Sequence, residues 1–213
     1  DSVKSRGLGD VYKRQVSPSL VHVFAKSSSE LKIPDLEYVM SPASFKEGTV
    51  GLLDKVSGMT LGVWQTRPKS NGYVKINSKN MHEPPIINPN YLSDPYDVDV
   101  LLKSIKIGRN LLSTSPLQPY LNGKTNPSND LQTDDELLSW ARNEGITVYH
   151  MIGTAKMGPK SDKLAVVNNK LKVRGIESLR VADASIMPTM PSGNTNAPTM
   201  MIAEKASDMI LGK

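Results

Sequence analysis

The sequence contains no cysteine in its 213 residues. A disulfide framework and a thiolate metal site are therefore excluded, and the absence agrees with a reducing compartment. No apolar run approaches the roughly 18–20 residues that a transmembrane helix requires. No segment has the charged-then-apolar build of a secretory signal either. We therefore expect a cytoplasmic protein without a transmembrane segment, with peripheral attachment to a membrane left open.

Aromatic residues and clustered charge are also scarce. Aromatics make up 5% of the chain, and the net charge of +5 comes from 26 basic and 21 acidic residues that are scattered along it. A nucleic-acid site would need a basic stripe with interleaved aromatic side chains, so we expect no nucleic-acid partner. The hydrophobic share of 38% is ordinary for a soluble globular protein, with room for one large domain or two small ones.

The N-terminal half reads mainly as strands. Residues 1–15 are polar and have no hydrophobic period, so we expect a non-native or disordered tail without packed structure. Segments 19–26, 35–42 and 59–68 are rich in β-forming residues and alternate in polarity. Asn71-Gly72 predicts a tight hairpin turn with positive φ, returning the chain along 72–79. Together these patterns predict a mostly antiparallel sheet.

Two helices are expected next. Residues 83–95 contain four prolines and predict a loop. Asp94-Pro95 then opens a helix over 96–112. Its expected apolar face consists of Val98, Leu101, Leu102, Ile105 and Leu112. Farther on, Thr133 and Glu136 have the spacing of a capping box for a short helix that Gly145 closes.

The last third of the chain holds the candidate chemistry. His150 stands at the mouth of a glycine-bearing loop, whereas His22 and His82 are expected to be structural or solvated, and the three offer no metal-ligand spacing. A neutral imidazole can take a hydroxyl proton near neutral pH. The amide of Asn194 could hydrogen-bond the substrate oxygen without competing for that proton. The alternative for each is structural: a packed histidine and a turn or capping asparagine.

A helix over 199–211 follows this turn, with Pro198 in its first turn and Gly212 at its end. Its free N–H groups would stabilise a developing anion. Asn194 and Asn196 are its capping candidates. A short strand in 179–185 ends at Asp183, which could bond a cofactor hydroxyl or amide, or could simply form a turn.

Several segments together resemble one known family. The C-terminal ones are YHMIGTAKMGP (149–159) and AVVNNKLKVRGIESLRVADASIMPTMPSGNTNAPTMMIAEKASDMI (165–210); the earlier ones are RPKSNGYVKI (67–76) and INPNYLSDPYDVDVLLKSIK (87–106). From residue 19 to the C-terminus, the chain resembles the C-terminal part of the glucose–methanol–choline (GMC) oxidoreductases. The likeness is greatest to their choline-dehydrogenase-like branch.

That resemblance implies FAD as the cofactor and an alcohol as the substrate. The family's histidine base lands on His150, and its His-or-Asn partner lands on Asn194. The segment that lies against FAD lands on Asp183 and Ala184, with Ser185 beside them. Asn194, Thr195 and Asn196 would contact the pyrimidine end of the flavin.

The chain departs from the family pattern in two places. Ala155 stands where the family usually has Cys, which changes little. The family's GxGxxG fingerprint, which cradles the ADP pyrophosphate, occurs nowhere in the sequence. We therefore expect a C-terminal fragment that is inactive alone and lacks the N-terminal FAD-binding half.

The expected fold class is α+β. Residues 16–145 would form an antiparallel-sheet substrate domain with flanking helices. Residues 146–213 would return to a Rossmann-like FAD-binding domain as a strand, turn and helix.

The expected reaction is oxidation of a small alcohol to an aldehyde or ketone, with hydride transfer to flavin N5 and O2 or a quinone as the final acceptor. The alternatives are a non-catalytic binding module and a non-redox flavin lyase of the same fold. Trp64, Tyr73 and Tyr149 are too few to predict an aromatic cage for choline.

Overall fold

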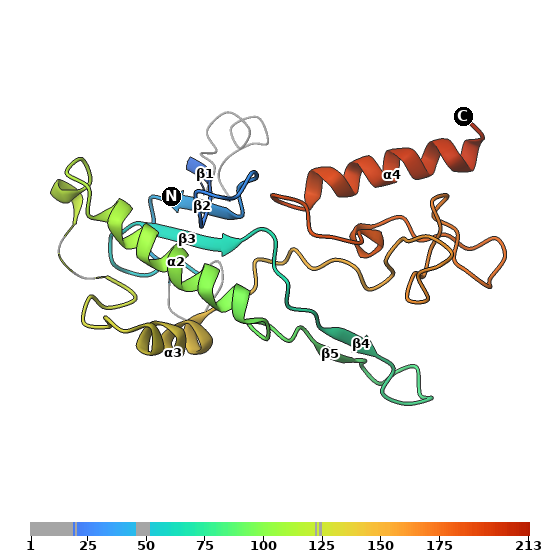
Figure 1. Cartoon of the computed structure of the whole chain (residues 1–213), viewed down its shortest axis with the longest axis horizontal. Coiled ribbons are helices and arrows are strands. Elements are labelled where there is room, and N and C mark those ends of the chain that lie inside the picture. The colour runs from blue at the N-terminus through green and yellow to red at the C-terminus, as the bar shows by residue number, and fades with distance from the viewer. Residues whose placement is uncertain (1–18, 20, 46–51, 122, 124) are drawn as a thin grey trace, which may run out of the picture.

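The computed structural model describes residues 19, 21–45, 52–121, 123 and 125–213 (Figure 1). The tail expected at 1–15 lies outside these residues. The described part is a mixed α/β structure with antiparallel sheets, which confirms the expected fold class. None of its helices has the length and apolarity to span a bilayer.

A three-stranded antiparallel sheet forms the first part of the fold. Its strands are β1 (Val21–Ala25), β2 (Leu36–Ser41) and β3 (Thr60–Gln65), in the order β1-β2-β3. All three lie within the segments that the alternation predicts. The register places Glu37 opposite both Phe24 and Trp64, and Tyr38 opposite Val23. Because side chains alternate along a strand, Glu37 and Tyr38 point to opposite faces of the sheet.

Helix α2 (Pro95–Leu112) packs on the face that carries Tyr38 (Figure 1). Asp94 caps it as expected, because its side chain accepts a hydrogen bond from the Tyr96 N–H at 2.9 Å. The Tyr38 hydroxyl donates to the Ser104 carbonyl at 2.9 Å. A Cβ at Gly108 would lie 3.6 Å from the Tyr38 ring, so a small residue there lets helix and sheet approach.

The expected apolar face of α2 needs correction. The buried residues are Asp97, Val100, Ser104, Ile105 and Gly108. Of the predicted face, only Ile105 is among them, whereas Leu101 and Leu102 are partly buried against α3 (Asp134–Glu144). The helix lies between the sheet and α3, so its sheet-facing stripe holds small residues where the Tyr38 ring needs space. Apolar periodicity alone does not reveal that stripe.

The expected hairpin at Asn71-Gly72 is wrong. Strand β4 (Tyr73–Lys75) does not return along β3; it pairs with β5 (Ile86–Asn88), within the segment expected to be a loop. Gly72 does not have a positive φ. It is required because a Cβ there would lie 2.0 Å from the Asn88 carbonyl oxygen. The buried Asp97 carboxylate accepts from the Lys69 N–H at 2.9 Å, which ties this segment to α2.

Prolines do not prevent β5 because Pro84, Pro85 and Pro89 flank it and none lies within it. Helix α3 is as expected. The Thr133 hydroxyl accepts from the Glu136 N–H at 3.3 Å, the Glu136 carboxylate accepts from the Thr133 N–H at 2.9 Å, and Gly145 ends the helix. A short 3-10 turn, η2 (Gln118–Tyr120), lies between α2 and α3.

Residues 146–195 are mostly irregular, and the strand expected in 179–185 is absent from this described segment. Arg180 makes only an isolated bridge with Lys172, and a 3-10 turn, η3 (Ala184–Ile186), follows. Helix α4 (Asn196–Leu211) begins three residues before the expected start and ends at Gly212, which has φ 72°. One cluster of buried side chains holds this part together: Val167, Leu171, Ile186, Met187, Ile202 and Ala206.

Candidate functional site

The loop that carries His150 is anchored to the turn that contains Asp183. The Ala155 N–H donates to the Ser185 carbonyl at 3.0 Å, and the Met157 N–H donates to the Ile186 carbonyl at 2.7 Å. Gly153 has φ 84°, a conformation that favours glycine. Two segments about 30 residues apart in the sequence therefore form one unit beside the start of α4.

Among the residues that the structure describes, the His150 imidazole has two side-chain hydrogen-bond partners, both in the turn before α4. Its Nε2 lies 2.9 Å from Nδ2 of Asn194, and its Nδ1 lies 3.1 Å from Oγ1 of Thr195. Since an amide nitrogen can only donate, Nε2 is the acceptor in this arrangement and the proton is on Nδ1. The ring is then neutral, with its lone pair directed at Asn194. Neutral imidazole is the protonation state that a general base requires.

Thr195 orients this ring and was not assigned that role from the sequence. It is buried and occupies the N-cap position of α4, yet its side chain makes no cap hydrogen bond. The hydroxyl lies at His150 instead, while the Thr195 carbonyl accepts from the Thr199 N–H at 3.1 Å. Asn194 and Asn196 are therefore not the N-cap, contrary to expectation. Pro198 at the third helical position was the available sequence signal, because proline favours the first turn.

Asn196 and Ala197 are the first two residues of α4, and both are exposed. Their N–H groups lie in the first turn of the helix and have no acceptor within it. This end of α4 carries the partial positive charge of the helix dipole. It can therefore accept an electron-rich group next to the imidazole.

Asp183 stabilises its own turn. Its carboxylate accepts from the Ser185 N–H at 2.8 Å and from the Ser185 hydroxyl, and it caps η3. Ala184 is partly buried against the C-terminal core. These contacts fit the turn-forming alternative for Asp183. The Asp183 residue is exposed and therefore accessible to a ligand. Its role in binding a cofactor stays a prediction.

The turn that bears Asn194 also touches the three-stranded sheet. Nε of Arg67 donates to Oγ of Ser192 at 2.7 Å, and a Cβ at Gly193 would lie 3.6 Å from the Phe24 ring. Arg67 follows β3, and Phe24 lies on β1. Figure 1 shows this turn reaching back toward the sheet from the start of α4. The candidate base is thus next to the sheet face that α2 leaves uncovered.

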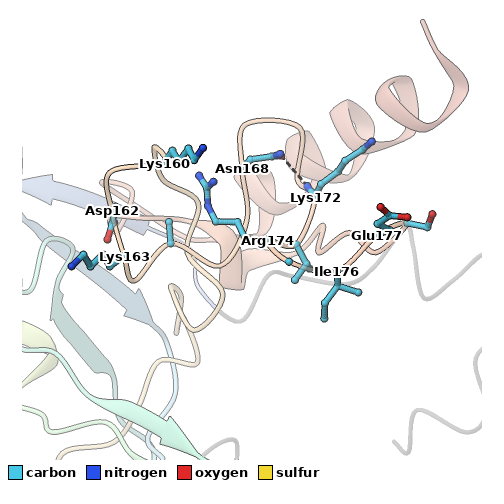
Figure 2. Close-up of a pocket in the computed structure, with 12 residues that line it drawn as sticks. Lys160, Asp162, Lys163, Asn168, Lys172, Arg174, Ile176 and Glu177 are labelled. Carbon is cyan, nitrogen blue, oxygen red and sulfur yellow. Dashed lines mark hydrogen bonds between the residues drawn. The ribbon is translucent and has the colours of Figure 1, made fainter.

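A separate hollow of about 770 Å³ lies among residues 160–178 (Figure 2). Its cationic lining residues are Lys160, Lys163, Lys172 and Arg174. Nη2 of Arg174 donates to the Gly158 carbonyl at 2.7 Å, and Asp162 pairs with Lys156 at 2.8 Å. That ion pair holds the pKa of Asp162 below its ordinary value. Neither His150 nor Asn194 lines this hollow, so it is distinct from the candidate site.

No group of three or more His, Asp or Glu side chains in the described part of the chain could hold a metal ion. The described site consists of an imidazole, an amide and a helix N-terminus. Residues 68–203, which include all of these groups, match the family model described as GMC oxidoreductase. The chain belongs to the GMC oxidoreductase family.

Two relatives each show 39% identity to this chain. An alcohol dehydrogenase [acceptor] from Pseudomonas putida matches over 194 residues, which cover 89% of this chain and 34% of that protein. An oxygen-dependent choline dehydrogenase from Staphylococcus aureus (strain JH9) matches over 192 residues, covering 89% of this chain and 33% of that protein. The chain thus spans about a third of the length of these GMC relatives.

The solved structure of a GMC enzyme indicates which cofactor the family uses. A formate oxidase from Aspergillus oryzae RIB40, in a structure concerned with its FAD modification, superposes with a TM-score of 0.76 at 28% identity. The match covers 86% of this chain and 32% of that one. The GMC family to which the chain belongs therefore includes FAD-dependent oxidoreductases with this fold.

Proposed function

We propose that this chain supplies the alcohol-activating part of an FAD-dependent oxidation of an alcohol to an aldehyde or ketone. The observation that carries the proposal is the contact of Nε2 of His150 with Nδ2 of Asn194 at 2.9 Å. It places a neutral base and a hydrogen-bond donor close enough to share one oxygen atom. Both residues lie within the part of the chain that matches the GMC model.

The proton chemistry follows from this pair. A substrate hydroxyl that enters between the two groups can donate its proton to Nε2 of His150. The Asn194 amide can donate a hydrogen bond to the same oxygen as that oxygen gains negative charge. Thr195 keeps the other ring nitrogen protonated, so that Nε2 remains the acceptor. His150 is then the base, Asn194 holds the oxygen, and Thr195 positions the ring.

The groups beside this pair fit FAD. The exposed amide of Asn196 and the N–H groups at the start of α4 are donors, which suit the carbonyl oxygens at the pyrimidine end of a flavin. Asp183, Ala184 and Thr195 complete the proposed set of cofactor-binding residues. Bound FAD supplies the acceptor for the hydride that leaves the carbinol carbon, as the O–H proton goes to His150 and the C=O bond forms.

The proposal extends to the organisation of the longer protein. Residues 16–145 provide the substrate side, and residues 146–213 return to the FAD side. The remaining cofactor contacts, including a pyrophosphate cradle, come from an N-terminal FAD-binding half of the same protein. The 213-residue chain is then inactive alone. The names of the two relatives support an alcohol substrate, and one of them supports O2 as the acceptor. A quinone as the alternative acceptor and a cytoplasmic location are further parts of the proposal.

The test is flavin reduction in the full-length enzyme. Anaerobic stopped-flow measurements with an alcohol should show that His150→Ala slows flavin reduction by about 10²- to 10⁴-fold, because the base is lost. His82→Ala is the matched control, since His82 lies in an exposed turn and should leave the rate unchanged. Reduction of the flavin by His150→Ala at the wild-type rate would disprove the assignment. If no alcohol bleaches the wild-type flavin, the result would favour a lyase or a binding module instead.

A further inference from the structure

A histidine–glutamate pair lies on the sheet face that α2 leaves uncovered. Nδ1 of His22 is 3.0 Å from Oε1 of Glu37, and the two residues occupy neighbouring strands. The Glu37 side chain has no exposed surface, whereas 43% of the His22 side chain is exposed. The sequence predicted only a structural or solvated role for His22, and it did not indicate Glu37 at all.

Because the Glu37 carboxylate is buried, its hydrogen bond to His22 replaces contact with water. The second carboxylate oxygen of Glu37, Oε2, has no hydrogen-bond partner among the residues that the structure describes. His22 is therefore the side chain that compensates a carboxylate removed from water. Because a carboxylate only accepts, the proton lies on Nδ1 of His22. In the neutral ring Nε2 is then an acceptor, and the pair carries the negative charge of Glu37.

The pair is close to the proposed catalytic turn. His22 and Phe24 are two residues apart on β1 and share a face, so they are separated by about 7 Å along the strand. The Phe24 ring lies beside Gly193, the residue before Asn194. Arg67, at the same end of the sheet, donates to Ser192. Phe24 thus stands between His22 and the turn that carries the substrate-activating amide.

Gly62 lies on the same face of the sheet as His22. The register places Val39 opposite His22 on one side and opposite Gly62 on the other. A Cβ at Gly62 would lie 3.8 Å from its nearest neighbours, which are atoms of Trp64 and Val39. Gly62 therefore lets the Trp64 ring lie on the same face of the sheet as the His22 imidazole. A substrate that extends from His150 over Phe24 would reach this face beside His22.

We propose that His22, positioned by Glu37, recognises the far end of the alcohol by accepting a hydrogen bond at Nε2 from a second hydroxyl or an ammonium group. The inference rests on the proposed function, because it needs the carbinol carbon to lie at His150 and Asn194. The substrate class is an alcohol that carries a hydrogen-bond donor at the end remote from the reacting carbon. His22 is a specificity residue, and Glu37 is a positioning residue that acts through it.

The experiment compares three alcohols of one chain length in the full-length enzyme: pentan-1-ol, pentane-1,5-diol and 5-aminopentan-1-ol. The kcat/KM for flavin reduction should favour the two donor-bearing alcohols over pentan-1-ol by about 10- to 100-fold. His22→Gln should remove that preference, because glutamine can still donate to Glu37 but lacks the outward ring nitrogen. His82→Gln is the matched control and should retain the preference.

Glu37→Gln separates the two donor groups. Its amide oxygen still accepts from Nδ1 of His22, so the preference for the diol should persist. The preference for the amino alcohol should fall, because the negative charge is gone. Glu37→Leu should abolish both preferences, and its far-ultraviolet circular dichroism reports whether the sheet is retained.

The inference is overturned if the wild-type enzyme oxidises all three alcohols equally, or if His22→Gln keeps the wild-type preference. In either case His150→Ala still tests the proposed function separately, with pentan-1-ol as the substrate. If no alcohol reduces the wild-type flavin, the proposed function fails and the role of His22 fails with it.

Discussion

Nε2 of His150 lies 2.9 Å from Nδ2 of Asn194, although 44 residues separate the two in the chain. The contact exists because the His150 loop is bonded to the η3 turn and because Asn194 lies two residues before α4, next to its N-cap Thr195. Both segments pack on one buried cluster. Backbone contacts thus bring the base and the hydrogen-bond donor together, and the Thr195 hydroxyl orients the imidazole. This geometry leads to two predictions besides the loss of activity in His150→Ala, and the pKa shifts of Glu136 and Tyr38 lead to two more.

Replacing the amide should slow chemistry without removing the base. Asn194→Ala should lower the rate of anaerobic flavin reduction by about 10²-fold, because one donor to the developing oxyanion is lost. Asn194→His should retain more activity than Asn194→Ala, since an imidazole can also donate to the oxygen. Equal rates for Asn194→Ala and the wild type would remove Asn194 from the mechanism.

The Thr195 hydroxyl should matter through the ring that it orients. Thr195→Val keeps the side-chain volume but removes the partner of Nδ1 in His150, so flavin reduction should slow by about 10-fold or more. Thr195→Ser should restore most of the rate. Nitrogen NMR of the imidazole provides the second readout: the valine variant should show a mixture of tautomers, and the serine variant should show a protonated Nδ1. A single tautomer in Thr195→Val would contradict the role.

The capping box of α3 should make that helix sensitive to acid. Hydrogen bonds from the Thr133 backbone and hydroxyl, and from the Gln132 backbone, hold the pKa of Glu136 below its ordinary value of 4.5. The folded pKa is the lower one, so this stabilisation is present above pH 4.5 and is lost as the pH falls through the folded pKa. Amide exchange in residues 134–144 should therefore accelerate in acid. Glu136→Gln should remove this dependence, since its amide oxygen accepts at every pH.

Tyr38 should make the sheet sensitive to alkali. Burial, with the nearby Asp35 carboxylate, raises the pKa of Tyr38 from 10.0 to about 12. Because the folded pKa is the higher one, its contribution to stability is complete below pH 10 and is lost as the pH rises toward 12. Urea unfolding should show a steeper decline in the wild-type protein than in Tyr38→Phe, which retains the raised pKa of Tyr96. At neutral pH, Tyr38→Phe should cost about 1 kcal/mol, because the hydrogen bond to the Ser104 carbonyl is lost.

Local chemistry made part of this fold predictable. The strand segments follow from alternation, α2 from Asp94-Pro95, and α3 from the spacing of Thr133 and Glu136. Each of these signals acts within a few residues, so it can be read without knowing what packs against the element. The family resemblance likewise follows from motifs that are continuous in the sequence, and the match of residues 68–203 confirms it.

The wrong predictions concern segments whose hydrogen-bond partners lie far away in the sequence. The Asn71-Gly72 pair predicts a hairpin by itself, but Asp97 captures the Lys69 N–H, and Gly72 is needed to approach Asn88 instead. Residues 179–185 have the composition of a strand, but in the described structure they pair only through one isolated bridge. Backbone hydrogen bonds to partners elsewhere in the chain decide such cases.

The sequence by itself determined the chemical types of the candidate site: an imidazole at 150, an amide at 194 and a helix that starts beside it. Only the tertiary structure decided that Nε2 of His150 faces Asn194, that Thr195 rather than an asparagine occupies the N-cap position, and that Glu37 is buried under His22. The physical reason is that residue type sets which hydrogen bonds a group can form. Packing sets which partner is within reach.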